Sequence, residues 1–185
     1  MALKARIFKL ELNIADMDRH YYQSHELTIA RHPSENDHRM MLRILVFSKH
    51  AHENLSFTKG LCVSDEPDVW RKNAADEIEA WVELGQPDEK RLRKACGKSG
   101  QVYVYPYHTK SAVVWWKQME SKLTRFNNLH IIHIPEVDTV DLSKLVKRNM
   151  FLQCSIQDDE VWFSDEQHSV HVRPEVWKLP SRVNE

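Results

Sequence analysis

Glycine is scarce in this chain, which has 4 glycines among 185 residues. No segment is rich enough in glycine, serine or proline to form a flexible linker between domains. Because 42% of the residues are hydrophobic and 29% are charged, the chain can bury a substantial core and keep a hydrated surface. We therefore expect a single domain that spans residues 1–185.

Cysteine is also rare, and its pattern excludes two kinds of small scaffold. The three cysteines, Cys62, Cys96 and Cys154, are odd in number and far apart, and no two of them form a CxxC pair. This pattern argues against a disulfide framework and against a zinc knuckle. Neither Cys96 nor Cys154 lies in a nucleophile signature, so we expect both to be buried thiols in a reducing compartment.

Long hydrophobic runs and a strong charge of one sign are absent. The first twenty residues contain charged side chains and no apolar run, which predicts no secretory signal, and no window approaches a membrane span. The sequence therefore predicts a cytoplasmic protein. The formal net charge of −1 predicts no strong long-range attraction to nucleic acid or to anionic lipid.

The hydrophobic pattern predicts alternating strands and helices. Two strands at 3–14 and 22–31 form an N-terminal hairpin, and a helix with Ser34 as its N-cap follows at 34–52. In the remainder we expect strands at 55–58, 67–71, 77–84, 102–107 and 129–134, helices at 89–98, 111–126 and 138–148, and a C-terminal meander at 150–156, 160–163 and 169–172. In helix 111–126, the spacing places Trp116 on the core side with Ala112.

The order of these elements predicts the fold class. A helix, three strands, a helix and a further strand occupy residues 34–107. Three successive strands indicate a mixed sheet, and the helix that follows allows a crossover back to it. We therefore expect an α/β fold with a mixed central sheet flanked by helices, and additional β elements at both ends of the chain.

Acidic side chains on neighbouring strands form the main candidate site. Asp68 follows Pro67 at the start of one strand, and Glu79 and Glu83 lie on one face of the strand at 77–84. A basic helix follows, with Lys94 among its cations. Carboxylates close to a cation suit a divalent metal bound against a phosphodiester.

The same segments carry a resemblance to known proteins. The order from 34 to 107 resembles the common core of the PD-(D/E)xK nuclease superfamily, and nearly the whole chain resembles the bacterial YaeQ family. The segments that carry the family resemblance are Met1-Ala2-Leu3-Lys4-Ala5, Arg31-His32-Pro33-Ser34-Glu35, Phe57-Thr58-Lys59-Gly60-Leu61, Asp65-Glu66-Pro67, Trp81-Val82-Glu83-Leu84-Gly85, Pro87-Asp88-Glu89, Arg93-Lys94-Ala95-Cys96, Trp115-Trp116 and Ile156-Gln157-Asp158. The resemblance implies a restriction-endonuclease-like core and says little about activity.

The superfamily pattern implies roles for particular residues. Asp68, with Glu79 or Glu83, would hold Mg²⁺, and Glu35 at the start of the first long helix would assist. The pattern places a lysine two residues after the second acid, but Trp81 and Gly85 stand there. Lys94, on the following helix, is our candidate for a displaced lysine that orients the attacking water, since its stem is long and flexible.

Two functions remain open from the sequence. The first is a Mg²⁺-dependent phosphodiesterase that acts on nucleic acid, with the residues named above as its site. The second is a non-catalytic binding or regulatory module that keeps the fold and uses the acidic cleft for a protein partner. In the second case, Glu79 and Glu83 would be a solvated strand face, and Glu35 and Arg39 would be an ordinary i,i+4 pair.

Overall fold

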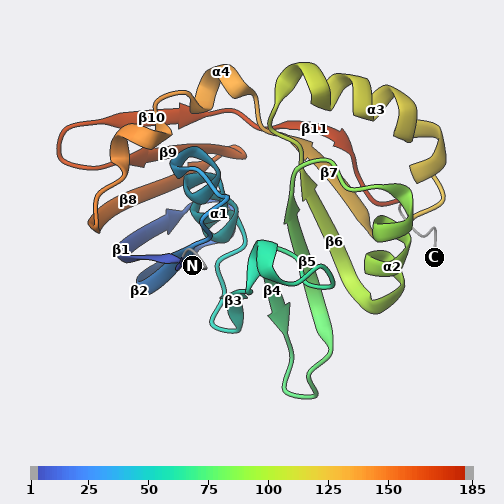
Figure 1. The fold of residues 1–185 in the computed structure, drawn as a ribbon, viewed down its shortest axis with the longest axis horizontal. Coiled ribbons are helices and arrows are strands. Elements are labelled where there is room, and N and C mark those ends of the chain that lie inside the picture. Colours follow the sequence, from blue (N-terminus) through green and yellow to red (C-terminus); the bar gives the residue numbers. More distant parts are fainter. Residues whose placement is uncertain (1–3, 182–185) are drawn as a thin grey trace.

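Two sheets enclose one central helix in this computed structural model, which describes residues 4–181 except the side chain of Cys62 (Figure 1). The helices are α1 (Asp37–Lys49), α2 (Glu89–Lys98), α3 (Thr109–Leu123) and α4 (Glu136–Thr139). The strands are β1 (Arg6–Asp16), β2 (Tyr21–Arg31), β3 (Leu55–Phe57), β4 (Val69–Lys72), β5 (Ile78–Leu84), β6 (Ser99–Tyr105), β7 (Leu129–His133), β8 (Asn149–Gln157), β9 (Glu160–Ser164), β10 (Ser169–Val172) and β11 (Glu175–Lys178).

The first sheet combines both ends of the chain in the order β10-β9-β8-β1-β2. The predicted N-terminal hairpin is confirmed by the antiparallel pairing of β1 with β2, and the C-terminal meander by the pairing of β8, β9 and β10. The additional β elements predicted at both ends of the chain are present, and they form a separate sheet together. Strand β1 pairs in parallel with β8, and the apolar faces of the two strands share one core.

The second sheet is the mixed central sheet that the sequence predicts, with the order β11-β7-β6-β5-β4-β3. Strands β5, β6 and β7 are parallel and are connected through α2 and α3, while β3, β4 and β5 are antiparallel. Helix α1 covers one face of this sheet, and α2 and α3 cover the other (Figure 1). The strand at β11 is one that the sequence analysis missed.

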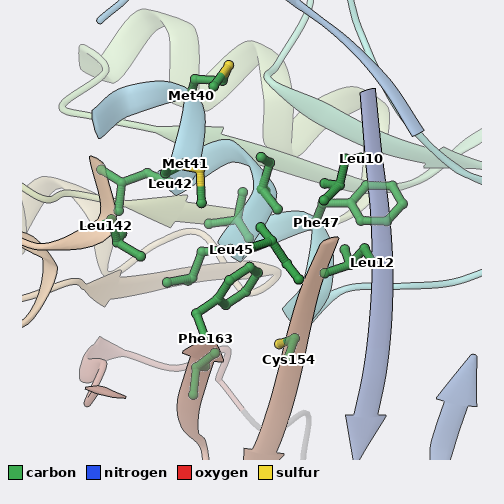
Figure 2. Packing of buried hydrophobic residues seen from close by; sticks show 14 of the residues in the cluster. Leu10, Leu12, Met40, Met41, Leu42, Leu45, Phe47, Leu142, Cys154 and Phe163 are labelled. Carbon is green, nitrogen blue, oxygen red and sulfur yellow. The ribbon is translucent and has the colours of Figure 1, made fainter. Parts of the chain in front are cut away.

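Helix α1 lies in the centre of the larger core. All residues from Met40 to Ser48 are buried. They pack with apolar side chains of the first sheet (Figure 2), and the same core includes Val69, Val82 and Leu84 on the second sheet. A helix that is surrounded on all sides by other elements needs an apolar surface all round, which explains the run Met40-Met41-Leu42 and Ile44-Leu45-Val46-Phe47. The charged Arg43 in this run is therefore an exception that needs partners.

The strand at β5 is buried on both faces. Val82 and Leu84 pack against α1, and Trp81 packs on the opposite face beside α2. This confirms the predicted alternation of the strand. It also corrects the expectation of a solvated face for Glu83, because the side chain of Glu83 is buried.

Several boundaries differ from those predicted. Helix α1 begins after Asn36, whose side chain accepts a hydrogen bond from the Arg39 amide, so Ser34 is not the N-cap and Glu35 precedes the helix. In α3, Trp115 is buried and Trp116 is only half-buried, because positions 112, 115, 119 and 123 form the apolar stripe.

Near the C-terminus, the helix predicted at 138–148 is only the short α4 and a 3₁₀ turn at 142–145. The predicted turn at Asp158-Asp159 is confirmed, and both residues have positive φ as a two-residue type I′ turn requires. None of the helices within residues 4–181 has the length and apolar character needed to cross a bilayer.

The packing of α1 predicts a large cost for truncating its aromatic side chain. Phe47 is 2% exposed and stacks on Phe57 with ring centroids 4.9 Å apart. We expect Phe47→Ala to lower the free energy of unfolding by about 3–5 kcal/mol in urea titrations. The matched control is Phe151→Ala, since Phe151 is 68% exposed, and there we expect a change within about 0.5 kcal/mol. Equal effects of the two substitutions would contradict this packing.

Candidate functional site

A cleft of about 350 Å³ lies at the carboxyl end of β5 and contains two of the predicted acids, Asp68 and Glu83. Arg39 from α1 and Arg91 from α2 line it together with these carboxylates. Ligands of open α/β sheets bind outside the carboxyl ends of parallel strands, and this cleft occupies that position beside the parallel pair β5 and β6.

Asp68 lies just before β4, where both of its carboxylate oxygens have partners. One oxygen accepts a hydrogen bond from the Arg39 guanidinium at 2.8 Å, and the other accepts from the Leu84 amide at 2.8 Å. The side chain is almost fully buried. Burial alone would lower the pKa of the Arg39 guanidinium, but Asp68, together with Tyr107 and Glu35, opposes burial, and the net effect raises the pKa of Arg39.

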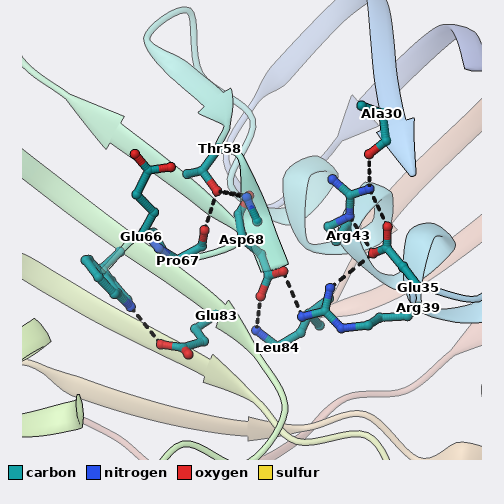
Figure 3. A network of polar contacts seen from close by, with 12 residues as sticks. Ala30, Glu35, Arg39, Arg43, Thr58, Glu66, Pro67, Asp68, Glu83 and Leu84 are labelled. Atoms are coloured by element: carbon teal, nitrogen blue, oxygen red, sulfur yellow. Dashed lines mark hydrogen bonds and ion pairs between the residues drawn. The ribbon is translucent and has the colours of Figure 1, made fainter. Parts of the chain in front are cut away.

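The Glu35 carboxylate accepts more hydrogen bonds than that of Asp68 (Figure 3). Arg43 donates to both of its oxygens at 2.8 Å, and Arg39 donates to one of them at 3.1 Å. Arg43 also donates to the Ala30 carbonyl in β2 at 3.0 Å. The buried charges form one network, in which Arg39 bridges Glu35 and Asp68.

Glu83 is bound on the other side of the same cleft. The Trp81 indole donates to it at 3.0 Å, and the Arg91 guanidinium forms an ion pair with it. Burial raises the pKa of the Glu83 carboxyl above its usual range, while Arg91 and the indole hydrogen bond oppose that rise. A buried carboxyl in a cleft with a raised pKa is a feature of many functional sites and also of structural ion pairs.

Arg91 connects α2 to the loop that closes the cleft. Besides Glu83, its guanidinium donates to the carbonyl groups of Ser64 and Glu66, the latter at 2.8 Å. This arginine therefore fixes the loop against the strand, which leaves it few donors for a ligand.

Two of the predicted site residues lie outside this cleft. Glu79 is half-exposed and pairs with Arg71 at 2.9 Å, and four residues of extended strand place it about 13 Å from Glu83. Lys94 is exposed and pairs with Asp65 at 2.6 Å. The structure thus brings Asp68, Glu83 and the Glu35 network together, and it does not bring Glu79 or Lys94 to them.

The fit of these acids to Mg²⁺ follows from their partners. Within residues 4–181, no three or more histidine, cysteine, aspartate or glutamate side chains are grouped so as to hold a metal ion. A cation at Asp68 would also have to displace the positive charge of Arg39. In this arrangement the acids do not fit a metal centre, and the metal roles of Asp68, Glu79 and Glu83 stay predictions.

The arginines were the residues that sequence reasoning missed. The pairing of Glu35 with Arg39 follows from their i,i+4 spacing, but the pairing of Arg39 with Asp68 joins residues 29 positions apart. The only local signal is a charged residue within an apolar helix, such as Arg43. A cation in that position predicts a buried carboxylate partner without saying which one.

Cys154 is buried as predicted, whereas Cys96 is only half-buried. Burial raises the pKa of Cys96 to about 11 and that of Cys154 to about 12, so both remain protonated at neutral pH.

Comparison with known proteins assigns the chain to a family. The family model described as YaeQ protein matches residues 1–174. The chain belongs to the YaeQ family. It is 43% identical over 181 residues to a protein of Escherichia coli (strain K12) that carries the name Uncharacterized protein YaeQ, and the match covers 98% of this chain and 100% of that protein. A protein of the same name from Salmonella typhi is 42% identical with the same coverage.

Two crystal structures of YaeQ proteins share the fold. The protein from Xanthomonas axonopodis pv. citri matches with a TM-score of 0.92 and 41% identity, covering 95% of this chain and 99% of that one. The protein from Pseudomonas syringae matches with a TM-score of 0.89 and 31% identity, covering 94% and 96%. The two-sheet architecture is therefore that of the family.

The buried network predicts that removing Arg43 lowers the stability of the chain far more than removing the exposed Arg93. Arg43→Met leaves the buried Glu35 with one cation fewer, and we expect it to lower the free energy of unfolding by about 3–5 kcal/mol. The control is Arg93→Met, because the exposed pair of Arg93 with Glu89 contributes at most about 0.5 kcal/mol. Urea titrations of both variants measure this difference, and a tolerated Arg43→Met would show that Glu35 does not depend on its cation.

Proposed function

We propose that the chain is a non-catalytic binding module whose cleft recognises a segment of a protein partner. One observation carries the proposal: the carboxylates of Glu35, Asp68 and Glu83 are each bound by an arginine of the chain itself. Carboxylates with such partners are poorly placed to ligate a metal or to accept a proton, and they are well placed to hold the walls of a cleft in one shape.

The lining of the cleft supports a protein segment as its occupant. The lining combines charged and apolar side chains, and Leu61 in it is 49% exposed. The apolar residues of the lining are Leu61, Val63, Pro67, Leu84 and Pro87. Sites that combine apolar surface with a few fixed polar groups suit mixed-character ligands such as peptides.

The charge of the cleft also favours a protein segment over nucleic acid as the occupant. Arg39 and Arg91 face three acids in the lining, Glu66, Asp68 and Glu83, and the whole chain has a formal net charge of −1. A polyanion gains little from such a surface, since binding to nucleic acid depends on cations that neutralise phosphates. A protein segment with a few charges needs no such excess.

A Mg²⁺-dependent phosphodiesterase that acts on nucleic acid is the second candidate. It is supported by Asp68 and Glu83, which line one cleft, and by the order α1, β3, β4, β5, α2, β6, which is the helix, three strands, helix and strand of the predicted restriction-endonuclease-like core over 34–107. This candidate needs Arg39 and Arg91 to leave their carboxylates before a metal can bind.

Peptide binding tests the first candidate. When a displayed library of random peptides is selected for binding to the full chain, we expect peptides that bind with micromolar affinity. The substitution Leu61→Asp places a charge on the apolar part of the cleft, so it should weaken this binding by at least about tenfold. Val140→Asp is the matched control, since Val140 is 61% exposed and lies outside the cleft. Selected peptides that all bind Leu61→Asp unchanged would contradict this use of the cleft.

Cleavage of a nucleic-acid panel with Mg²⁺ or Mn²⁺ separates the two candidates. The binding module predicts the same background cleavage for the natural chain and for the variants Asp68→Asn and Glu83→Gln. Metal-dependent cleavage that both substitutions abolish would overturn the binding module in favour of the phosphodiesterase.

A further inference from the structure

A second cavity lies at the opposite end of α1 from the cleft. It has a volume of about 330 Å³ and is lined by residues of both sheets and by Lys49 and His50 at the end of the helix. Ten residues separate Arg39 in the cleft from Lys49 in this cavity, which corresponds to about 15 Å along the helix axis. The cleft and this cavity have no lining residue in common, so they are separate sites.

Three neighbouring aromatic rings form one wall of this cavity, with Tyr103 stacked on His130 and the His50 ring tilted by 55° to Tyr103. The ring of Tyr103 lies 4.3 Å from that of His50 and 4.2 Å from that of His130, the latter nearly parallel with an interplanar angle of 19°. The fully buried Tyr105 fixes this wall, because its hydroxyl lies 2.7 Å from His50 Nε2. A fixed wall of three aromatic side chains is a surface against which a planar ring can pack.

Lys49 provides a buried cation whose donors are mostly unused. Its side chain is 10% exposed, and its one hydrogen bond to a described residue is to the Asp159 carbonyl at 3.2 Å. The Asp159 carboxylate is 3.9 Å away, which is too far for a hydrogen bond. Burial lowers the pKa of Lys49, and Asp159 opposes that shift. An ammonium has three donors, so two are available to a ligand.

Arg71 adds a second cation on β4. Its Nε donates to Glu79 at 2.9 Å, and among the described residues no hydrogen bond involves its four other N–H groups. A guanidinium has five donors in a planar fork that matches carboxylate and phosphate groups. Arg71 therefore offers the cavity a geometry suited to an anion.

The acids that line the cavity are already occupied. Asp16 accepts hydrogen bonds from the Arg19 side chain at 2.6 Å and from two backbone amides, and Asp18 accepts from the amides of Asp158 and Asp159. The side chain of Asp159 is 87% exposed and can point to solvent. The unpaired hydrogen-bonding capacity of the cavity thus lies with cationic donors.

We propose that this cavity binds a small anion that carries a planar ring, with the ring against the wall of His50, Tyr103 and His130 and the phosphate or carboxylate group at Lys49 and Arg71. The site is separate from the cleft, and the proposal stands whether or not the cleft binds a protein. A cavity of about 330 Å³ lies at the small end of the range of ligand pockets.

The histidines support this division of roles. Burial lowers the pKa of His130 to about 4 and that of His50 well below its usual value. Both rings are therefore neutral at pH 7, so they act as stacking surfaces and leave the contacts with the anion to the lysine and the arginine.

Calorimetric titration of the full chain tests the proposal. The ligands are the four nucleoside 5′-monophosphates and 4-hydroxybenzoate, which represent the phosphate and carboxylate sources, and orthophosphate, acetate and the uncharged nucleosides serve as fragments. At least one ring-bearing anion should bind at least about tenfold more tightly than its fragments. The proposal is overturned if none of the ring-bearing anions binds more tightly than its fragments.

Substitutions locate the site. Lys49→Met and Tyr103→Leu should each weaken binding by about tenfold or more, the loss expected for one charged hydrogen bond or one stacked ring. Lys144→Met and Tyr22→Leu are matched controls, because these exposed residues lie outside the cavity.

The controls should bind as the natural chain does. Unchanged binding by Lys49→Met would contradict the proposal. If Tyr103→Leu does not fold, the ring signals of His50 and His130 in the NMR spectrum of the natural chain decide, because they must shift as the ligand binds. Binding without such shifts would place the ligand elsewhere.

Discussion

The charge network at the start of α1 is the interaction on which the arrangement of the two sheets depends. Arg43 binds Glu35 and the Ala30 carbonyl in the first sheet, and Arg39 binds Asp68 beside the second sheet. Because these groups are buried, each charge requires its partner, and the partners come from segments far apart in the chain. The apolar surface of α1 supplies the cohesion between the sheets, and the network fixes their register.

This network also determines what the cleft can do. The same acids that suggest metal-dependent chemistry in the sequence act in the structure as acceptors for arginine. Arg91 has a similar effect on the other side, where it holds both Glu83 and the loop above the cleft. The cleft is consequently a preformed surface without an excess of positive charge, while Lys49 and Arg71 in the second cavity keep unused donors.

Local patterns predicted the elements well and their partners poorly. The alternation of β5 and the cap of α2 at Asp88 depend on neighbours in sequence, and both were predicted correctly. The pairing of β1 with β8 was not, because apolar alternation identifies a buried face without naming the strand beside it. For the same reason the sequence could not choose between Glu79 and Glu83, since that choice depends on the register that pairs Val69 with Val82.

A double-mutant cycle on Arg39 and Asp68 tests the central claim most directly. Urea unfolding of Arg39→Met, Asp68→Asn and the double variant gives the coupling energy between the two side chains. If the carboxylate serves the structure, the coupling should be at least about 1.5 kcal/mol and each single substitution should destabilise the chain. A coupling near zero, with Asp68→Asn more stable than the natural chain, would contradict the account, because catalytic acids are commonly kept at a cost in stability.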